Sequence, residues 1–324
     1  MQRLRLDGEE EPFPSLGRLP EPVDAPCELI AALVSAMRVT GADVSYVECM
    51  GLSGTAFMLR KSRGPFAHVD ATRGRERFVT DALADLGFGD AQVVNLHGGI
   101  PEALVAELKV GRAPVARGCF PEALWRVGIV VGLVSDNLWS VLDCSGRVHA
   151  LAPRADFLLL VGAPGEKLSP APSVLLWRCL DAWEGMDEDE GVGGWRHWVE
   201  ALRAEPELKG EAARVALSAH EVLYETLLDA RAAGATWLAD LAERAGGMAG
   251  DWLEGAARKL YELAELLDSR HPPVHHPDTE PAFRDAAWRA KLAALLSEAA
   301  ELDLSAKHDV AQAIEADYPP GGGD

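Results

Sequence analysis

The clearest periodic pattern in the chain begins at Asp24 and ends at Gly41. Apolar residues recur there with the three- and four-residue spacing of one helix face, and aspartate and glycine are residues that start and end helices. We therefore predict an amphipathic helix over 24–41. Its apolar stripe consists of Leu29, Ile30, Leu33, Val34 and Met37.

The rest of the first half combines two shorter helical patterns with several short β-rich runs. Helices are predicted over 75–86 and 101–109, because both patterns stop near a glycine. Close spacing between the predicted strands, as at the Ser145-Gly146 turn, favours antiparallel pairing and an α+β fold class. The predicted strands cover 92–95, 114–117, 127–134, 139–143, 148–151 and 157–161.

From about residue 173 onward, strand patterns give way to helices rich in Ala, Leu, Glu and Arg. No fixed-period repeat is present, so a compact bundle is favoured over a solenoid. The predicted helices cover 173–183, 194–203, 211–232, 236–246, 250–269 and 281–315. The predicted organisation is an irregular lead-in (1–19), an α+β domain (20–168), an all-α helical domain (172–318) and a disordered tail (319–324).

The formal net charge of −20 is concentrated in the second half. Residues 1–165 carry 20 acidic and 16 basic residues, whereas residues 166–324 carry 31 and 15. Such a surface repels phosphate backbones and anionic lipids, so we expect neither nucleic acid nor membrane as a partner.

The cysteines and the apolar runs indicate the cellular compartment. Five widely spaced cysteines without a C-x-x-C pair argue against a disulfide framework and a zinc ribbon. No apolar run approaches the ~20 residues of a membrane span, and residues 1–26 contain no signal-peptide core. We expect a cytoplasmic protein with reduced thiols and with neither a metal nor a cofactor.

Cys27 lies in the first turn of the predicted amphipathic helix, a position that matters chemically. Unpaired N–H groups and the helix dipole stabilise a thiolate there, which makes Cys27 a candidate nucleophile. The alternative is a small buried residue at a helix start, since free cysteines are usually buried and inert.

Several segments resemble a known family. They are Cys27 to Leu33, Val44-Ser45-Tyr46, Met50 to Phe57 (MGLSGTAF), 128–132 with 139–143, and, in the second half, 194–198 and 256–261. On these segments most of the chain resembles the butirosin-biosynthesis H-protein family, whose N-terminal domain is similar to the papain-like peptidases that process bacteriocin leaders. The resemblance implies a papain-like fold with the cysteine on the central helix, and a role in bacterial secondary metabolism. It also implies either acyl transfer from a carrier-protein thioester to an amine or peptide cleavage.

The position of the general base departs from this pattern. Where the peptidase relatives carry a histidine, this chain has Arg126 beside Trp125, and arginine cannot accept a proton at neutral pH. Arg126 and Trp125 are therefore candidate binding residues. Asp143 matches the residue that orients the histidine, and its alternative role is a strand-end carboxylate. His149, and less favourably His97, is the candidate replacement base.

Two further features concern the pocket expected around Cys27. No glutamine stands shortly before Cys27, so the backbone N–H at the helix start remains the candidate oxyanion donor. Gly51-Leu52-Ser53-Gly54-Thr55 lacks the spacing of a nucleophile elbow. We expect Ser53 and Gly54 to border the pocket, with the glycines letting this segment pass close to the Cys27 helix.

The segment over 271–278 is rich in histidine, a residue that ligates metals. Its three imidazoles and one carboxylate include ligand types that zinc uses, but three prolines break any regular spacing. A solvated loop is the favoured interpretation.

Two functional classes remain open from the sequence. In one, the chain is a degenerate papain-like protein that binds a peptide, an acyl carrier protein or a small molecule in the old cleft. In the other, it is an active cysteine-dependent acyltransferase or amide or peptide hydrolase with Cys27 as its nucleophile. Either class is compatible with a homo-oligomer.

Overall fold

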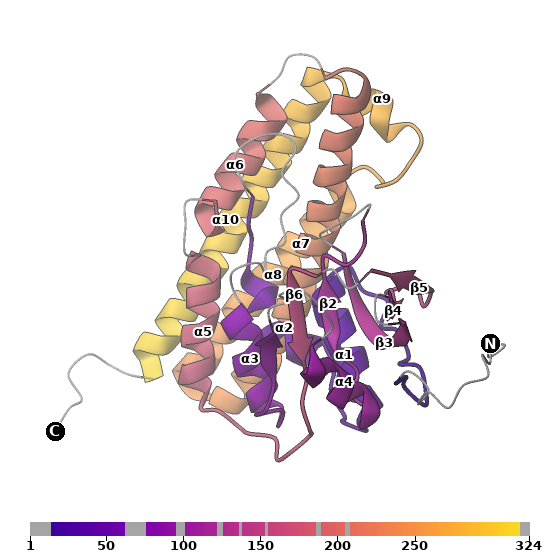
Figure 1. The fold of residues 1–324 in the computed structure, drawn as a ribbon. Coiled ribbons are helices and arrows are strands. Elements are labelled where there is room, and N and C mark those ends of the chain that lie inside the picture. Colours follow the sequence, from indigo (N-terminus) through magenta and orange to yellow (C-terminus); the bar gives the residue numbers. More distant parts are fainter. Residues whose placement is uncertain are drawn as a thin grey trace, which may run out of the picture.

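The computed structural model describes residues 14–61, 76–94, 101–121, 126–135, 138–152, 155–185, 189–204 and 208–317. The predicted disordered tail and most of the predicted lead-in lie outside these residues. Trp125 and His97 also lie outside them. Figure 1 shows a strand-bearing half beside a set of long helices that extends beyond it.

The first half is built around one antiparallel sheet of six strands, in the order β1-β6-β2-β3-β4-β5. The antiparallel pairing predicted from the short connections is confirmed, and so is the α+β class. The strands are β1 (Gln92–Val94), β2 (Val115–Arg117), β3 (Val127–Ser135), β4 (Leu138–Leu142), β5 (Val148–Leu151) and β6 (Phe157–Leu160). The helices of this half are α1 (Glu28–Val39), α2 (Tyr46–Leu52), the 3₁₀ turn η1 (Thr55–Phe57), α3 (Glu76–Asp85) and α4 (Glu102–Lys109).

Helix α1 packs against the sheet, with β3 as its main strand contact. The predicted apolar stripe is buried, as expected for a helix that packs across a sheet. The helix begins later than predicted, because its N-cap is Cys27 and Asp24 is an exposed residue before it. Pro26 explains the difference, since the residue before a proline is disfavoured in helical conformation.

The second half consists of six helices among the described residues. They are α5 (Pro172–Glu184), α6 (Gly191–Arg203), α7 (Gly210–Ala245), α8 (Gly247–Arg270), α9 (Thr279–Phe283) and α10 (Ala286–Asp317). The two helices predicted over 211–232 and 236–246 form the single helix α7. The one predicted over 281–315 is divided into α9 and α10.

Gly234 lies inside α7 because the helix needs a residue without a side chain there. A Cβ atom at Gly234 would lie 3.1 Å from the Phe57 ring and 3.3 Å from the Cβ of Ala56. The close approach of η1 therefore leaves little room for a side chain here and favours glycine at a position that helix propensity alone disfavours.

The glycines of the Gly51–Phe57 segment also face the second half, which corrects the expectation that they approach the Cys27 helix. A Cβ at Gly51 would lie 2.2 Å from the Trp237 ring of α7. Gly54 has a φ of +66°, and a Cβ there would lie 2.7 Å from the Cβ of Ala182 on α5. The segment is thus shaped by its contact with α5 and α7.

The larger hydrophobic core crosses the boundary near residue 170. It joins Val34 of α1 and Trp139 of β4 to Trp237 of α7, Leu260 of α8 and Ile314 of α10. A second core lies within the helical half and the Leu59 segment that reaches it, and it includes Trp198, Leu227, Leu263 and Leu296. The two halves differ in secondary structure but share the larger core.

A buried arginine reinforces this junction. Arg231 of α7 is fully buried, and its Nε and Nη2 donate to the two carboxylate oxygens of Asp303 on α10 at 2.7 and 3.0 Å. Its Nη1 donates to the carbonyl oxygens of Ala56 (2.6 Å) and Met58 (3.4 Å). The Trp195 indole N–H also donates to Asp303, at 2.8 Å. Arg231 therefore links α7, α10 and the segment after α2.

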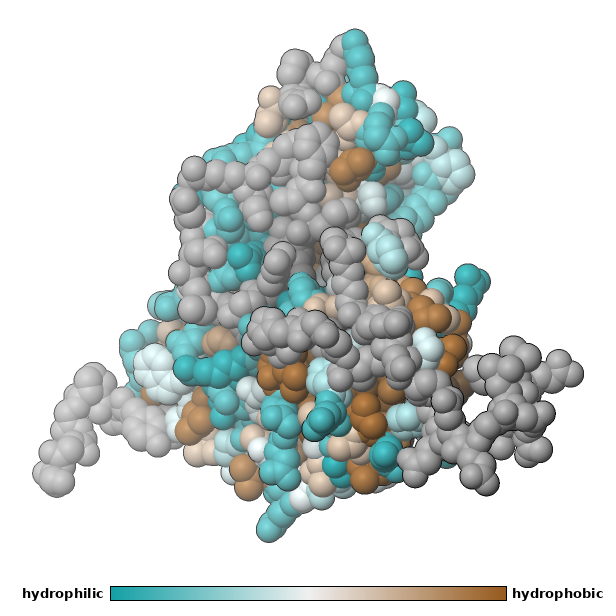
Figure 2. All heavy atoms as spheres, in the orientation of Figure 1, coloured by the Kyte–Doolittle hydropathy of each residue, from teal (hydrophilic) through white to brown (hydrophobic). Residues whose placement is uncertain are grey.

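The surface of the molecule differs between the two halves. In Figure 2 hydrophobic residues gather mainly over the strand-bearing half, whereas hydrophilic residues dominate the outer end of the helical half. Val134, Leu138 and Val148, on β3, β4 and β5, are among the exposed hydrophobic side chains. Within the described residues, no helix combines the length and the apolar character needed to cross a membrane.

Candidate functional site around Cys27 and Asp143

Cys27 is 6% exposed and forms the N-cap of α1, where it lies beside Tyr46, the first residue of α2. The Tyr46 hydroxyl donates a hydrogen bond to the Asp229 carboxylate of α7. Burial, followed by the charges of Cys27 and Asp229, raises the pKa of Tyr46 well above its usual range. Tyr46 is therefore a neutral phenol at physiological pH.

Asp143 and His149, the predicted orienter and base, lie together. Asp143 directly follows β4 and accepts a hydrogen bond from Ser145 (2.7 Å) and one from the Arg147 backbone N–H (2.9 Å). Its other carboxylate oxygen lies 2.8 Å from Nε2 of His149 on β5. The hairpin between β4 and β5 explains this proximity, because it sets Val141 opposite His149 in the register.

The Asp143 carboxyl group is held in its ionised form. Burial by itself would raise its pKa, but hydrogen bonds from Ser145, the Arg147 backbone and His149 outweigh that effect and lower the pKa to about 2. A carboxylate that is ionised across the working pH range can orient and stabilise an imidazolium at His149.

Arg126 lies between two carboxylates. Its Nε is 3.2 Å from Oε1 of Glu28, the residue after Cys27, and its Nη2 is 3.6 Å from Oδ2 of Asp143. The guanidinium also lies over the Phe120 ring at 4.9 Å, while His149 meets the same ring edge-on at 5.4 Å. The predicted binding residue is thus already engaged in ion pairs and a cation–π contact.

Glu28 fixes the start of α1 to the start of β3. Its Oε2 accepts a hydrogen bond from the Val127 backbone N–H at 2.9 Å, while its Oε1 faces Arg126. A carboxylate in the first helical turn is also favoured by the helix dipole. Glu28 therefore connects the Cys27 position to Arg126 and, through Arg126, to Asp143.

Two further thiols, those of Cys119 and Cys144, lie near the charged side chains of Glu28 and Arg126. Burial raises the pKa of both Cys119 and Cys144 to about 12. The Glu28 carboxylate also raises the pKa of each thiol, whereas the Arg126 guanidinium lowers it. Burial also raises the pKa of Cys49 and Cys179 above the usual range. These four cysteines are protonated at neutral pH and are weak nucleophiles.

Ser53 and Gly54 have structural contacts. Ser53 is 1% exposed, and its hydroxyl lies 2.8 Å from the Thr55 hydroxyl and donates to the Met50 carbonyl at 3.4 Å. Gly54 packs against Ala182, as described above. Both residues thus contribute to the junction with the helical half.

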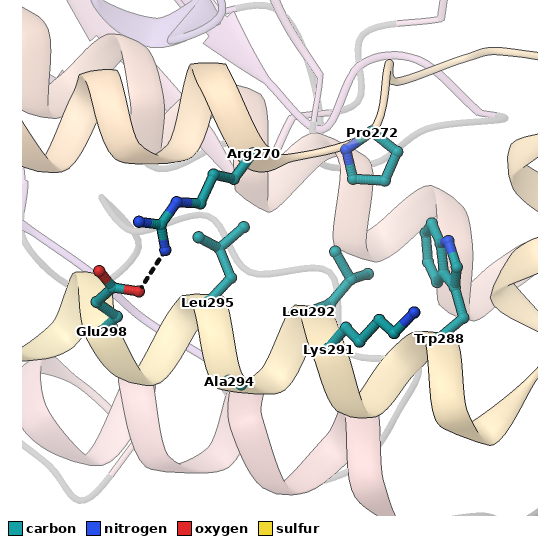
Figure 3. Close-up of a pocket in the computed structure, with 8 residues that line it drawn as sticks. All are labelled: Arg270, Pro272, Trp288, Lys291, Leu292, Ala294, Leu295 and Glu298. Atoms are coloured by element: carbon teal, nitrogen blue, oxygen red, sulfur yellow. Dashed lines mark hydrogen bonds and ion pairs between the residues drawn. The ribbon is translucent and has the colours of Figure 1, made fainter.

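The hollow beside Asp143 is narrow, and a larger groove lies elsewhere. The hollow lies between α1 and strands β3 and β4, and Ser35, Gly128 and Leu142 contribute to its lining. The larger groove, of about 440 Å³, lies between the C-terminal end of α8 and α10. In Figure 3 Leu292 and Leu295 line it, with the Arg270–Glu298 ion pair (2.7 Å) along one side.

The histidines of 271–278 point to different partners. The segment is a loop with mostly exposed residues, as expected, but His271 is buried, and its Nε2 lies 2.8 Å from Nε2 of His220. His275 instead faces Glu221 (3.2 Å) and Glu225 (3.4 Å) on α7. Among the described residues, no group of three or more His, Cys, Asp or Glu side chains could hold a metal ion.

Sequence reasoning missed three residues of the candidate site, namely Glu28, Tyr46 and Asp229. Glu28 could have been considered from its position next to Cys27 in the first helical turn. Asp229 carries no comparable signal, because 183 positions separate it from Tyr46.

Sequence comparisons add no assignment. The chain matches no protein-family model, and no curated protein is significantly similar to it.

Proposed function

We propose that this chain is a papain-like protein that binds a peptide, an acyl carrier protein or a small molecule beside Cys27 without converting it, in bacterial secondary metabolism. The observation that carries the proposal is the position of Arg126 between Glu28 and Asp143. Arg126 stands where the resemblance requires the general base.

The arrangement of the elements supports the papain-like part of the proposal. Cys27 is the N-cap of a buried helix that packs on an antiparallel sheet; Asp143 directly follows β4, and His149 lies on the neighbouring strand β5. The resemblance implies such a placement for the cysteine and for Asp143, whereas His149 is a replacement base outside the order of the family.

The charges around Arg126 support binding over turnover. Arginine cannot shuttle a proton between a thiol and a leaving group, because its guanidinium stays protonated. Its two carboxylate partners stabilise that charge further. A ligand can still form hydrogen bonds with the guanidinium, since arginine has five N–H donors in total.

The Asp143–His149 hydrogen bond favours the second candidate function, a cysteine-dependent acyltransferase or hydrolase. A carboxylate 2.8 Å from an imidazole is the arrangement that raises the basicity of a catalytic histidine. In this alternative, His149 takes the proton of Cys27 and Asp143 stabilises the imidazolium.

Turnover of a small acyl thioester separates the two functions. The intact chain is incubated with S-acetyl-N-acetylcysteamine, and thiol release is compared among the wild type, Cys27→Ala and His149→Gln. We expect equal release from all three proteins. We also expect pantetheine, the thiol arm of acyl carriers, to slow alkylation of Cys27 by iodoacetamide in the wild type.

Thioester cleavage by the wild type that both substitutions abolish would establish the enzyme and overturn the binding proposal. Arg126→His provides the complementary measurement, because it returns an imidazole to the base position. We expect this variant to gain release of thiol that a second substitution, Cys27→Ala, removes.

A further inference from the structure

The groove between α8 and α10 lies apart from the Cys27 position. It is at the outer end of the helical half, whereas α1 packs on the sheet in the strand-bearing half (Figure 1). Its volume of about 440 Å³ falls within the range of roughly 300–1,000 Å³ that small-molecule sites occupy. The side chains that line the groove therefore decide what it can bind.

One face of α10 forms an apolar floor. Trp288, Leu292 and Leu295 follow one another at intervals of three or four residues, so they lie on the same side of the helix. Figure 3 shows Leu292 and Leu295 pointing from α10 into the groove, with Pro272 on the opposite side. Ala294 lines the groove as well, and this exposed, small residue leaves the space above the floor open.

Trp288 forms an aromatic wall at one end of this floor. Its ring is half-buried and meets the buried Phe283 ring edge-on, with 6.0 Å between the ring centres. Packing on Phe283 therefore orients the indole before any ligand arrives. A ring that is already held in place offers a large apolar surface at a small cost in conformational entropy.

The charged residues of the lining leave one cation without a partner. Arg270 and Glu298 neutralise each other in an ion pair of 2.7 Å. Lys291 forms no ion pair with any described residue, and the residues three and four positions from it on α10 are all uncharged. Acidic residues outnumber basic ones by 31 to 15 over 166–324, so this uncompensated ammonium is a local exception that attracts an anion.

We infer that the groove binds a small organic carboxylate, whose apolar body lies on the leucine floor against Trp288 and whose carboxylate pairs with Lys291. A single available ammonium group balances a monoanion. A phosphate, with nearly two charges and three acceptor oxygens, is better matched by several arginine donors, and Arg270 is already paired with Glu298. This site goes beyond the proposed function, because it shares no residue with the surroundings of Cys27.

The test compares 4-phenylbutyrate with its neutral amide, 4-phenylbutanamide, by isothermal titration calorimetry on the full chain. We expect the carboxylate to bind about three- to tenfold more tightly than the amide, the ratio for one partly screened charge-assisted contact. Added salt should reduce this ratio. Lys291→Gln should lower the affinity for the carboxylate to that for the amide and leave the amide unchanged. Lys307→Gln is the matched control, because it removes the same charge from α10 at a residue that pairs with Glu184 outside the groove.

A substitution that fills the groove tests the apolar part of the inference. Ala294→Phe should abolish the binding of both ligands, because it places a ring above the floor at an exposed position where no core packing is lost. Ala290→Phe is its control, since Ala290 is exposed on the same helix and does not line the groove. Circular dichroism confirms that both variants keep the helical content of the wild type.

Three results would overturn the inference. They are an absence of carboxylate binding to the wild type up to about 10 mM, equal affinities for the carboxylate and the amide, and binding that Ala294→Phe leaves unchanged. Self-association of a wild type that binds no carboxylate, reversed by Ala294→Phe in sedimentation experiments, would assign the groove to a second copy of the chain and would also overturn it. None of these results depends on whether Cys27 binds or converts a ligand.

Discussion

The Arg231–Asp303 pair allows a quantitative test of how the two halves are joined. Both side chains are buried, and Arg231 also donates to the Ala56 and Met58 carbonyls. Arg231→Met removes the cation but leaves the buried Asp303 carboxylate uncompensated. Breaking a buried pair in this way costs about 3–5 kcal/mol of unfolding free energy. The two backbone carbonyls lose a donor as well, which adds to the loss.

A double-mutant cycle separates the charge effect from packing. Asp303→Leu should be about as destabilising as Arg231→Met, because it strands the arginine and leaves the Trp195 indole N–H without its acceptor. The double variant has no charge left at this position. We expect it to be more stable than either single variant, with a remaining cost of about 1–3 kcal/mol for the unpaired N–H and carbonyl groups.

The measurement is urea unfolding at pH 7, followed by tryptophan fluorescence and by far-UV circular dichroism. The control is Arg270→Met, which removes an ion pair to Glu298 whose side chains are 59% and 50% exposed. Exposed pairs contribute about 0–1 kcal/mol, so this variant should be nearly as stable as the wild type. A loss for Arg231→Met no larger than that for Arg270→Met, or additive effects in the cycle, would refute the reasoning.

Two further predictions concern stability. The Trp198 indole N–H donates to Nδ1 of His220 (3.1 Å), so the neutral His220 ring carries its proton on Nε2, which donates to Nε2 of His271. Burial lowers the pKa of His220 to about 3. This neutral imidazole stabilises the fold fully above the unfolded pKa of 6.5, and its contribution is lost as the pH falls toward 3. Between pH 7 and pH 4.5, the unfolding free energy measured by chemical denaturation should therefore fall by about 2–3 kcal/mol more in the wild type than in His220→Gln. An equal fall in the two proteins would contradict this expectation. Gly51→Ala places a Cβ 2.2 Å from the Trp237 ring, so thermal melts should show the folded protein to be less stable by about 1–3 kcal/mol. Gly17→Ala is the control, because there is open space around Gly17, and its stability should equal that of the wild type.

Local patterns in the sequence were sufficient for most of the secondary structure. The short strands were found because β-branched and apolar residues cluster between turn residues, and β5 begins and ends as predicted. Helix α2 was missed because it is only seven residues long and owes its position to contacts with α7. Helix α7 was predicted as two helices, over 211–232 and 236–246, and the structure has Gly234 between them packed close to the Phe57 ring, a contact that helix propensity does not register.

In the candidate site, too, contacts between residues close in the sequence could be predicted, whereas contacts between residues far apart in the sequence could not. The Asp143–His149 pair was predictable, because a hairpin of six positions separates the two residues. The Arg126–Glu28 pair spans 98 positions and the Tyr46–Asp229 bond spans 183. Contacts of this kind depend on how elements pack, and a single sequence carries no periodic signal for them.

The middle of α7 explains why the two halves cannot be treated as separate functional units. Asp229 binds Tyr46, Arg231 binds the Ala56 and Met58 carbonyls, and Gly234 and Trp237 pack against Phe57 and Gly51. All of these contacts fall on the single stretch from Tyr46 to Met58. Helix α7 thus packs directly on the stretch that follows the Cys27 helix in the chain. We therefore expect substitutions along this part of α7 to alter the packing of the Tyr46–Met58 stretch as well as the helical half.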